Sequence, residues 1–116
     1  MGSSELREVD LERGMPRADQ ALKQLTFELR RSRSLGYAAV KLIHGYGSTG
    51  KGGRIRVEAR ALLGRMAARG EVRGVIFGED FSIFNAPVLE AFHRCPALRR
   101  DRDLERHTNG VTIVLL

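Results

Sequence analysis

The sequence is poor in the residues that mark secreted and membrane proteins. It has one cysteine, no tryptophan and three prolines, and its apolar runs are much shorter than a membrane-spanning helix requires. A single cysteine excludes an internal disulfide and fits a reducing compartment. The polar, acidic N-terminus lacks the apolar segment of a signal peptide. We therefore expect a cytoplasmic protein without membrane segments, in which Cys95 is a half-buried small side chain and not a catalytic thiol.

What is present is an ordinary globular composition, with 42% hydrophobic and 29% charged residues in a chain of 116 residues. A chain of this length corresponds to one domain and buries roughly 65% of its unfolded surface, enough to fold without disulfides or structural metals. We expect a single domain over residues 1–116, with residues 1–6 forming a disordered tail.

The net charge of +6 is unevenly distributed along the chain. Residues 1–20 carry 3 basic and 5 acidic side chains, residues 21–73 carry 12 and 3, and residues 74–116 carry 5 and 6. The positive excess therefore lies in the central section, as expected for a domain that binds a polyanion such as nucleic acid. The alternative is that the arginine bias, 17 of 20 basic residues, reflects genome composition and decorates solvated faces.

Hydrophobic periodicity predicts alternating strands and helices. Strands are expected at 7–11, 38–43, 72–77 and 111–115, and helices after Pro16, from Arg54 to Gly70, and over 86–94. This β-α-β-α-β-β order, with an extra short helix before the last strand, predicts an α/β fold in which helices pack on a mixed sheet of about four strands in two layers.

Two further predictions concern the second helix and the irregular stretch 78–109. The second helix is expected to present Arg56, Arg60, Arg65 and Arg69 on its outer face. In the irregular stretch 78–109, the mixed-sign segment 99–106 is expected to form a solvated turn or short helix, and four apolar side chains are expected to be buried: Phe81, Ile83, Phe84 and Phe92.

The glycine-rich segment after Ile43 joins a buried strand to a helix start. Glycine permits positive φ and brings backbone N–H groups close to a ligand, and the first N–H groups of a helix are unpaired at its positive dipole end. Tyr46 is expected to stack on a base or to be merely exposed. The sequence therefore predicts a phosphate-binding segment made of Gly45, Tyr46, Gly47, Ser48, Thr49, Gly50, Lys51, Arg54 and Arg56.

The same segment partly matches the nucleotide-binding pattern G-x-x-x-x-G-K. In that pattern the next residue is Ser or Thr, because its hydroxyl holds magnesium, whereas here it is Gly52. ATP or GTP hydrolysis is therefore disfavoured, and nucleotide binding is kept as a lesser alternative.

Ionisable residues follow the predicted strands. His44 ends the second strand, where it could act as an acid, a base or a phosphate donor, or only hold the loop by hydrogen bonds. Asp10 and Glu12 follow the first strand and would lie near His44 if the two strands are parallel neighbours. Carboxylates there could hold a metal or orient water, or only form a turn. Glu79 and Asp80, at the end of the third strand, have the same two interpretations.

These residues resemble the motifs of small MutS-related (Smr) domains. Leu42-Ile-His-Gly-Tyr-Gly47, with Ser48-Thr-Gly50 after it, is similar to the family's second motif, a strand ending in His-Gly-x-Gly. Val9-Asp-Leu-Glu-Arg-Gly14 stands where the first motif reads Asp-Leu-His-Gly, and Gly110-Val-Thr-Ile-Val-Leu115 resembles the closing strand. The likeness covers residues 7–77 and 110–116.

The resemblance implies a compact α/β domain that binds DNA or RNA, and some family members nick or cleave nucleic acid. Cleavage would use His44 as the acid or base, and Asp10 with Glu12 on Mg²⁺, Mn²⁺ or water. Glu12 stands where the first motif has histidine, the loop is extended by Lys51-Gly-Gly, and 78–109 is longer than in the family. The expectation is therefore nucleic-acid binding, with a metal-assisted endonuclease or an acidic protein partner as alternatives.

Overall fold

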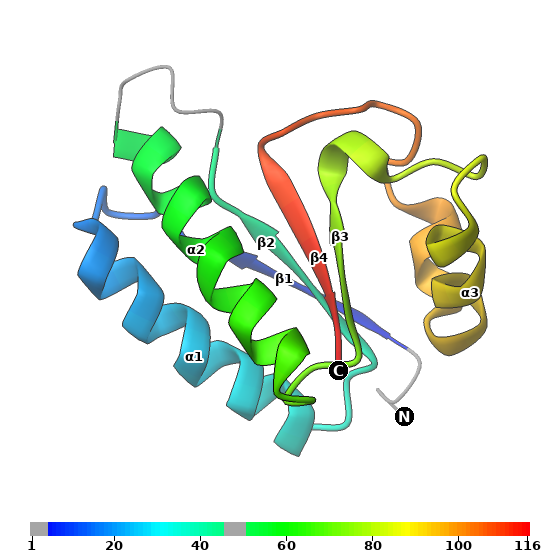
Figure 1. The fold of residues 1–116 in the computed structure, drawn as a ribbon, viewed down its shortest axis with the longest axis horizontal. Coiled ribbons are helices and arrows are strands. Elements are labelled where there is room, and N and C mark those ends of the chain that lie inside the picture. Colours follow the sequence, from blue (N-terminus) through cyan, green and yellow to red (C-terminus); the bar gives the residue numbers. More distant parts are fainter. Residues whose placement is uncertain (1–4, 46–50) are drawn as a thin grey trace.

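The computed structural model describes residues 5–45 and 51–116, with only the backbone of residues 51 and 52 (Figure 1). Its elements follow the predicted order: β1 (Leu6–Asp10), α1 (Ala18–Ser34), β2 (Ala39–Ile43), α2 (Lys51–Ala68), β3 (Gly74–Phe77), η1 (Gly78–Asp80), α3 (Ala86–Arg94), η2 (Pro96–Arg100) and β4 (Val111–Leu115). In the described part of the chain, no helix is both long and apolar enough for a membrane crossing.

The four strands form one mixed sheet in the order β1-β2-β4-β3. β1 and β2 are parallel, and β4 runs antiparallel to both of its neighbours, β2 and β3. The predicted α/β class with a four-stranded mixed sheet is confirmed. Because β1, β2 and β3 run in the same direction, their carboxyl ends meet at one end of the sheet, beside the start of β4.

Helices cover both faces of the sheet, so the fold has three layers where we expected two (Figure 1). Side chains alternate along β2, so that Val40 and Leu42 pack with α1 and α2 while Ala39 faces α3 and η2. The apolar residues Ala18, Ala21, Leu25 and Leu29 form a buried stripe on α1, which places this helix flat on its face of the sheet. The apolar core between the sheet and α3 contains Cys95, whose thiol is buried, and this burial raises the pKa of the thiol.

Two of the apolar side chains that we expected in the core are on the surface. Phe81 and Phe92 are buried, but Ile83 is 47% and Phe84 is 89% exposed. The turn that carries these two residues is bound to its neighbours through its backbone, with the Ile83 N–H donating to Glu105 Oε2 at 2.6 Å. The hydrogen-bonded backbone therefore directs the side chains outward, and the prediction of burial for Ile83 and Phe84 is wrong.

The segment 99–106 forms the predicted short helix and turn, and none of its residues is buried, but it also has a packing role that we did not expect. Lys41 is fully buried in the middle of β2, and its Nζ lies 2.9 Å from Asp101 Oδ1 and in contact with the carboxylate of Asp103. A buried ammonium group requires anionic partners, because burying an unpaired charge is very costly. The mixed-sign segment is therefore held against the sheet by its two aspartates.

Candidate nucleic-acid interface

The predicted carboxylates lie where β1 and β2 end together. Asp10 is the register partner of Ile43, and the Leu11 N–H donates to the Ile43 carbonyl at 2.8 Å. The Asp10 side chain accepts a hydrogen bond from the Glu12 N–H at 2.8 Å, which shapes the turn after the strand. The expectation that these carboxylates lie near the start of the glycine segment is confirmed.

Glu12 and Gly45 are in direct contact. Gly45 has φ of +76°, a conformation that side chains with a Cβ rarely adopt, and a Cβ at this position would collide with the Glu12 carboxylate. Glycine is therefore required here for both its backbone conformation and its size. The contact also places a negative charge at the first residue of the glycine segment.

His44 is fully buried, and both nitrogens of its ring are in hydrogen bonds. Nδ1 lies 3.2 Å from the Gly45 carbonyl and Nε2 lies 2.8 Å from Thr112 Oγ1. Because a carbonyl oxygen can only accept, Nδ1 carries the proton, and the Thr112 hydroxyl donates to Nε2 of the neutral ring. Burial, together with the nearby charges of Arg60 and Arg56, lowers the pKa of His44 to about 4.

This environment favours the loop-holding interpretation of His44. A neutral, buried imidazole with both nitrogens occupied has no free position for a substrate proton. The His44 and Gly45 N–H groups both bond to the Gly110 carbonyl at 3.0 Å, which joins the start of the glycine segment to the turn before β4. In this arrangement His44 fixes the place from which the segment leaves the sheet.

Arg60 belongs to the same polar cluster, although its side chain was expected on the outer face of α2. It is only 10% exposed, and its guanidinium donates to both carboxylate oxygens of Glu79 at 2.7 and 2.9 Å. It also donates to Thr112 Oγ1 at 3.0 Å and stacks 4.1 Å over the ring of Phe77. The prediction failed because Arg60 borders the buried stripe of α2, and its long side chain reaches past this stripe to β4 and η1.

The pair of acidic residues after β3 is mainly structural. The hydrogen bonds from Arg60 lower the pKa of Glu79, so this carboxylate is ionised and paired. The Asp80 carbonyl accepts from Asn85 Nδ2 at 3.0 Å, and its carboxylate is exposed. The described residues contain no group of three or more His, Cys, Asp or Glu side chains placed to hold a metal ion.

The cations at the start of α2 differ in how they are paired. Arg54 is exposed and binds Glu58 one turn later, with its Nε 2.6 Å from the carboxylate. Arg56 is half-buried, and its Nε is shielded from solvent without a hydrogen-bond partner in the described structure. Residues 46–50 and the side chain of Lys51, which were also predicted to bind phosphate, lie outside the described residues.

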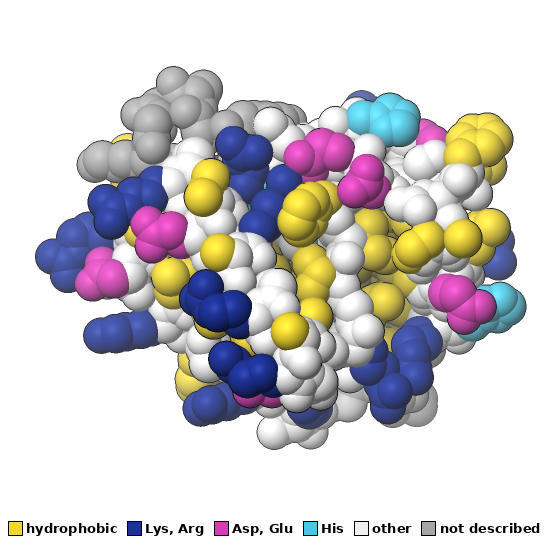
Figure 2. Space-filling view, in the orientation of Figure 1, with side chains coloured by type: hydrophobic (Ala, Val, Ile, Leu, Met, Phe, Trp, Pro, Cys, Tyr) yellow, Lys and Arg dark blue, Asp and Glu magenta, His cyan; other side chains and the backbone are white. Residues whose placement is uncertain are grey.

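Most of the remaining central charges lie on one layer of the molecule. Figure 2 shows Lys and Arg side chains gathered over α1 and α2. Four of these side chains are exposed and have no ion-pair partner among the described residues: Lys23, Arg30, Arg31 and Arg65. The positive charge predicted from the sequence is thus collected on the outside of the α1–α2 layer.

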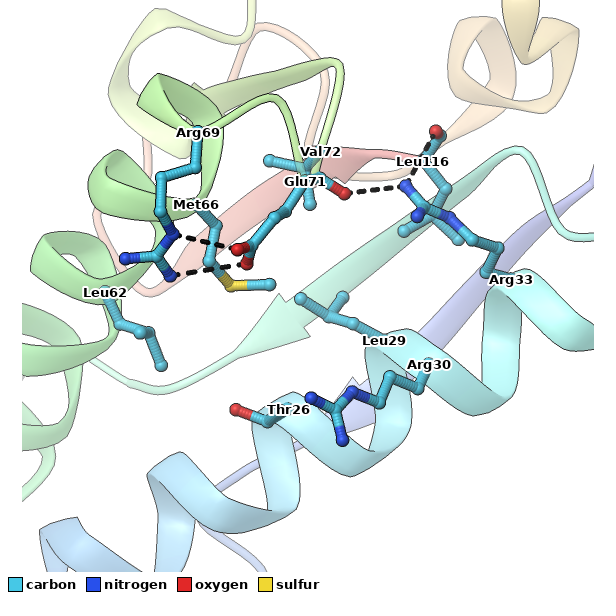
Figure 3. A pocket seen from close by; sticks show the side chains of 10 residues that line it. All are labelled: Thr26, Leu29, Arg30, Arg33, Leu62, Met66, Arg69, Glu71, Val72 and Leu116. Atoms are coloured by element: carbon cyan, nitrogen blue, oxygen red, sulfur yellow. Dashed lines mark hydrogen bonds and ion pairs between the residues drawn. The ribbon is translucent and has the colours of Figure 1, made fainter.

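A groove that the sequence did not reveal lies where the carboxyl-terminal halves of α1 and α2 approach each other (Figure 3). Its floor is apolar and includes Leu29, Leu62 and Met66. Three arginines surround the groove. Arg33 donates to the Glu71 carbonyl at 2.7 Å, and Arg69 pairs with the Glu71 carboxylate at 2.8 Å. Arg30 lies at the rim without a hydrogen bond or ion pair among the described residues, although its charge acts on Glu71.

Comparison with models of protein families, with characterised proteins and with solved structures finds no match to this chain.

Proposed function

We propose that this chain is a nucleic-acid-binding domain of the Smr-like kind, which holds the phosphate backbone at the start of α2 and along the α1–α2 layer. The observation that carries the proposal is the unpartnered Nε of Arg56 beside the strand ends. A buried donor without an acceptor is costly, and a phosphate oxygen would satisfy it once the guanidinium, whose Nε is shielded from solvent, turns outward. The free cations on the α1–α2 layer supply the sequence-independent attraction that such binding requires.

The buried state of His44 favours binding over cleavage by this residue. An endonuclease in which His44 acts as acid or base would need the imidazole to reach the scissile phosphate. The side chain is instead enclosed, and its Nε2 accepts from Thr112. Supercoiled plasmid incubated with Mg²⁺ or Mn²⁺ should therefore remain intact. Cleavage that disappears in both His44→Ala and Asp10→Ala would favour the endonuclease alternative.

Fluorescence anisotropy with labelled DNA and RNA, in single and double strands, tests binding over a range of salt concentrations. For duplex DNA, the logarithm of affinity should fall with the logarithm of salt concentration by about 0.9 for each phosphate contacted. An interaction that is absent, or that is insensitive to salt, would contradict the proposal.

Matched charge reversals test which layer binds. Arg30→Glu with Arg65→Glu, on the α1–α2 layer, should lower affinity for all sequences by about tenfold or more. The control is Arg94→Glu with Arg106→Glu, two exposed positions in the α3–β4 region, and it should have a much smaller effect. Equal losses in both variants would mean that net charge, and not this layer, determines binding.

The phosphate position itself is tested at Arg56. Arg56→Lys keeps the positive charge but removes the Nε donor, so its affinity should fall close to that of Arg56→Ala. If Arg56→Lys binds like the unchanged protein, the side chain contributes only its charge, and the unpartnered Nε does not mark a phosphate site. The Lys51→Ala, Arg54→Ala double variant should weaken binding to all sequences alike.

A further inference from the structure

The two edge strands of the sheet differ in how they are protected. The order β1-β2-β4-β3 leaves β1 and β3 at the edges, where unpaired backbone groups are open to further pairing. β1 reads Leu-Arg-Glu-Val-Asp and carries charged side chains, a common protection against unwanted pairing. β3 reads Gly-Val-Ile-Phe and carries none. The β3 edge therefore lacks the protection that the β1 edge has.

Large apolar side chains are exposed in β3 and in the segment that follows it in the chain. Phe77 in the strand, Ile83 and Phe84 in the following turn, and Leu89 on α3 are all large hydrophobic residues that reach solvent. Phe84 is the most exposed of them, at 89%. Figure 2 looks onto this edge and shows apolar side chains on both sides of it. An open strand edge with apolar flanks is typical of an interaction surface.

The turn that presents Phe84 is held in place by hydrogen bonds. The Ile83 N–H donates to Glu105 Oε2 at 2.6 Å, the Phe84 N–H donates to Ser82 Oγ at 3.2 Å, and Asn85 Nδ2 donates to the Asp80 carbonyl at 3.0 Å. Because the backbone is already ordered, burying Phe84 against a partner would cost little additional conformational entropy.

We propose that the β3 edge is the interface with a second copy of this chain, formed by antiparallel β3–β3 pairing around a two-fold axis perpendicular to the sheet. The pairing would join the two four-stranded sheets into one continuous sheet and cover the apolar flanks of both copies. This axis keeps the α1–α2 layers of both copies on the same side of the joined sheet.

The charges at the two ends of β3 favour a second copy as the occupant. Arg73 precedes the strand, and Glu79 and Asp80 follow it. Antiparallel pairing centred on Ile76 brings the Arg73 end of each strand to the end of the other strand where η1 carries Glu79 and Asp80. Arg73 and Asp80 are exposed, and neither has an ion-pair partner among the described residues. Parallel pairing of the two edges would place like charges together instead.

Sedimentation velocity over a range of protein concentrations tests the proposal. The mass should rise from 12.9 kDa toward twice that value. Hydrogen exchange at the Val75 and Phe77 amides should slow as the concentration rises. Phe84→Glu should raise the dimer dissociation constant by about tenfold or more. Phe27→Glu is the matched control, because Phe27 is also exposed but lies on α1, and it should leave the dissociation constant unchanged.

A charge swap tests the two-fold geometry. Arg73→Asp and Asp80→Arg should each weaken the dimer, since each single variant places like charges opposite one another. The double variant should restore part of the affinity, because the swapped pair is again complementary while Glu79 stays paired with Arg60. A chain that stays monomeric at all concentrations overturns the proposal. The proposal is also overturned if this edge binds an extended peptide of another protein while the chain itself stays monomeric. A dimer that is insensitive to Phe84→Glu and not rescued by the double variant overturns it as well.

Discussion

Two polar side chains only three residues apart, Lys41 in β2 and His44 just after it, are buried on opposite faces of the sheet in opposite electrostatic surroundings. Lys41 lies among the carboxylates of Asp101, Asp103 and Glu8. Burial by itself would lower the pKa of Lys41, but the hydrogen bonds to Asp103 and Asp101 outweigh it and raise this pKa. His44 lies near guanidinium groups, and its pKa is lowered to about 4.

The difference shows that the two clusters have different tasks. The Lys41 cluster is closed, since every charge in it has an opposite charge nearby, and it holds the segment after η2 against the sheet. The His44 cluster lies at the end of the sheet, at the foot of the glycine segment, and beside it Arg56 keeps an unpartnered donor. We therefore expect the first to determine stability and the second to position a binding surface.

The largest expected effect on the free energy of unfolding comes from changes in the Lys41 cluster. Lys41→Met removes the buried cation and leaves Asp101 and Asp103 facing each other, so the free energy of unfolding should fall by about 3–5 kcal/mol. Urea denaturation, monitored by circular dichroism, measures this free energy. The triple variant Lys41→Met, Asp101→Asn, Asp103→Asn should recover much of the loss. A loss below about 1 kcal/mol in Lys41→Met would mean that the cluster contributes little.

The next effect is a dependence of stability on pH on the His44 side. The pKa of His44 is about 4 in the folded chain and 6.5 as an ordinary histidine, so between these values the unfolded chain binds a proton that the folded chain does not. The stabilisation is complete above pH 6.5 and is lost as pH falls toward 4, by up to about 3 kcal/mol.

The matched control for this pH dependence is His44→Gln, which keeps an acceptor for Thr112 but does not titrate. Urea denaturation of both proteins over this pH range should give a steeper decline for the unchanged chain than for the variant. Parallel curves would mean that His44 is not held neutral in the fold.

The smallest effect concerns the link between His44 and Arg60. Thr112→Val removes the hydroxyl that donates to His44 Nε2 and accepts from Arg60 Nε, while it preserves the shape of the side chain. The free energy of unfolding should fall by about 1–2 kcal/mol. Nuclear magnetic resonance titration of His44 should then show a changed pKa. A variant with unchanged stability and an unchanged titration would contradict the assigned hydrogen-bond chain.

The local spacing of apolar residues predicted the helices and strands and many of their bounds. The spacing of apolar residues predicted α3 at 86–94 and β4 at 111–115 with the bounds that the structure has. It predicted the start of α2 at Arg54, three residues late, because Lys51, Gly52 and Gly53 have no apolar side chain to mark the helix. The meeting of Asp10 and Glu12 with the start of the glycine segment followed from the expectation of parallel neighbouring strands.

The sequence alone determined the α/β order, the mixed sheet and the concentration of positive charge in the central section, because periodicity and charge are read from residues close together in the chain. The tertiary structure decided which polar groups are buried together. Lys41 and Asp101 are 60 residues apart, and His44 and Thr112 are 68 apart. The folded sheet brings such pairs together, and for the same reason Arg60 is enclosed while Phe84 is exposed.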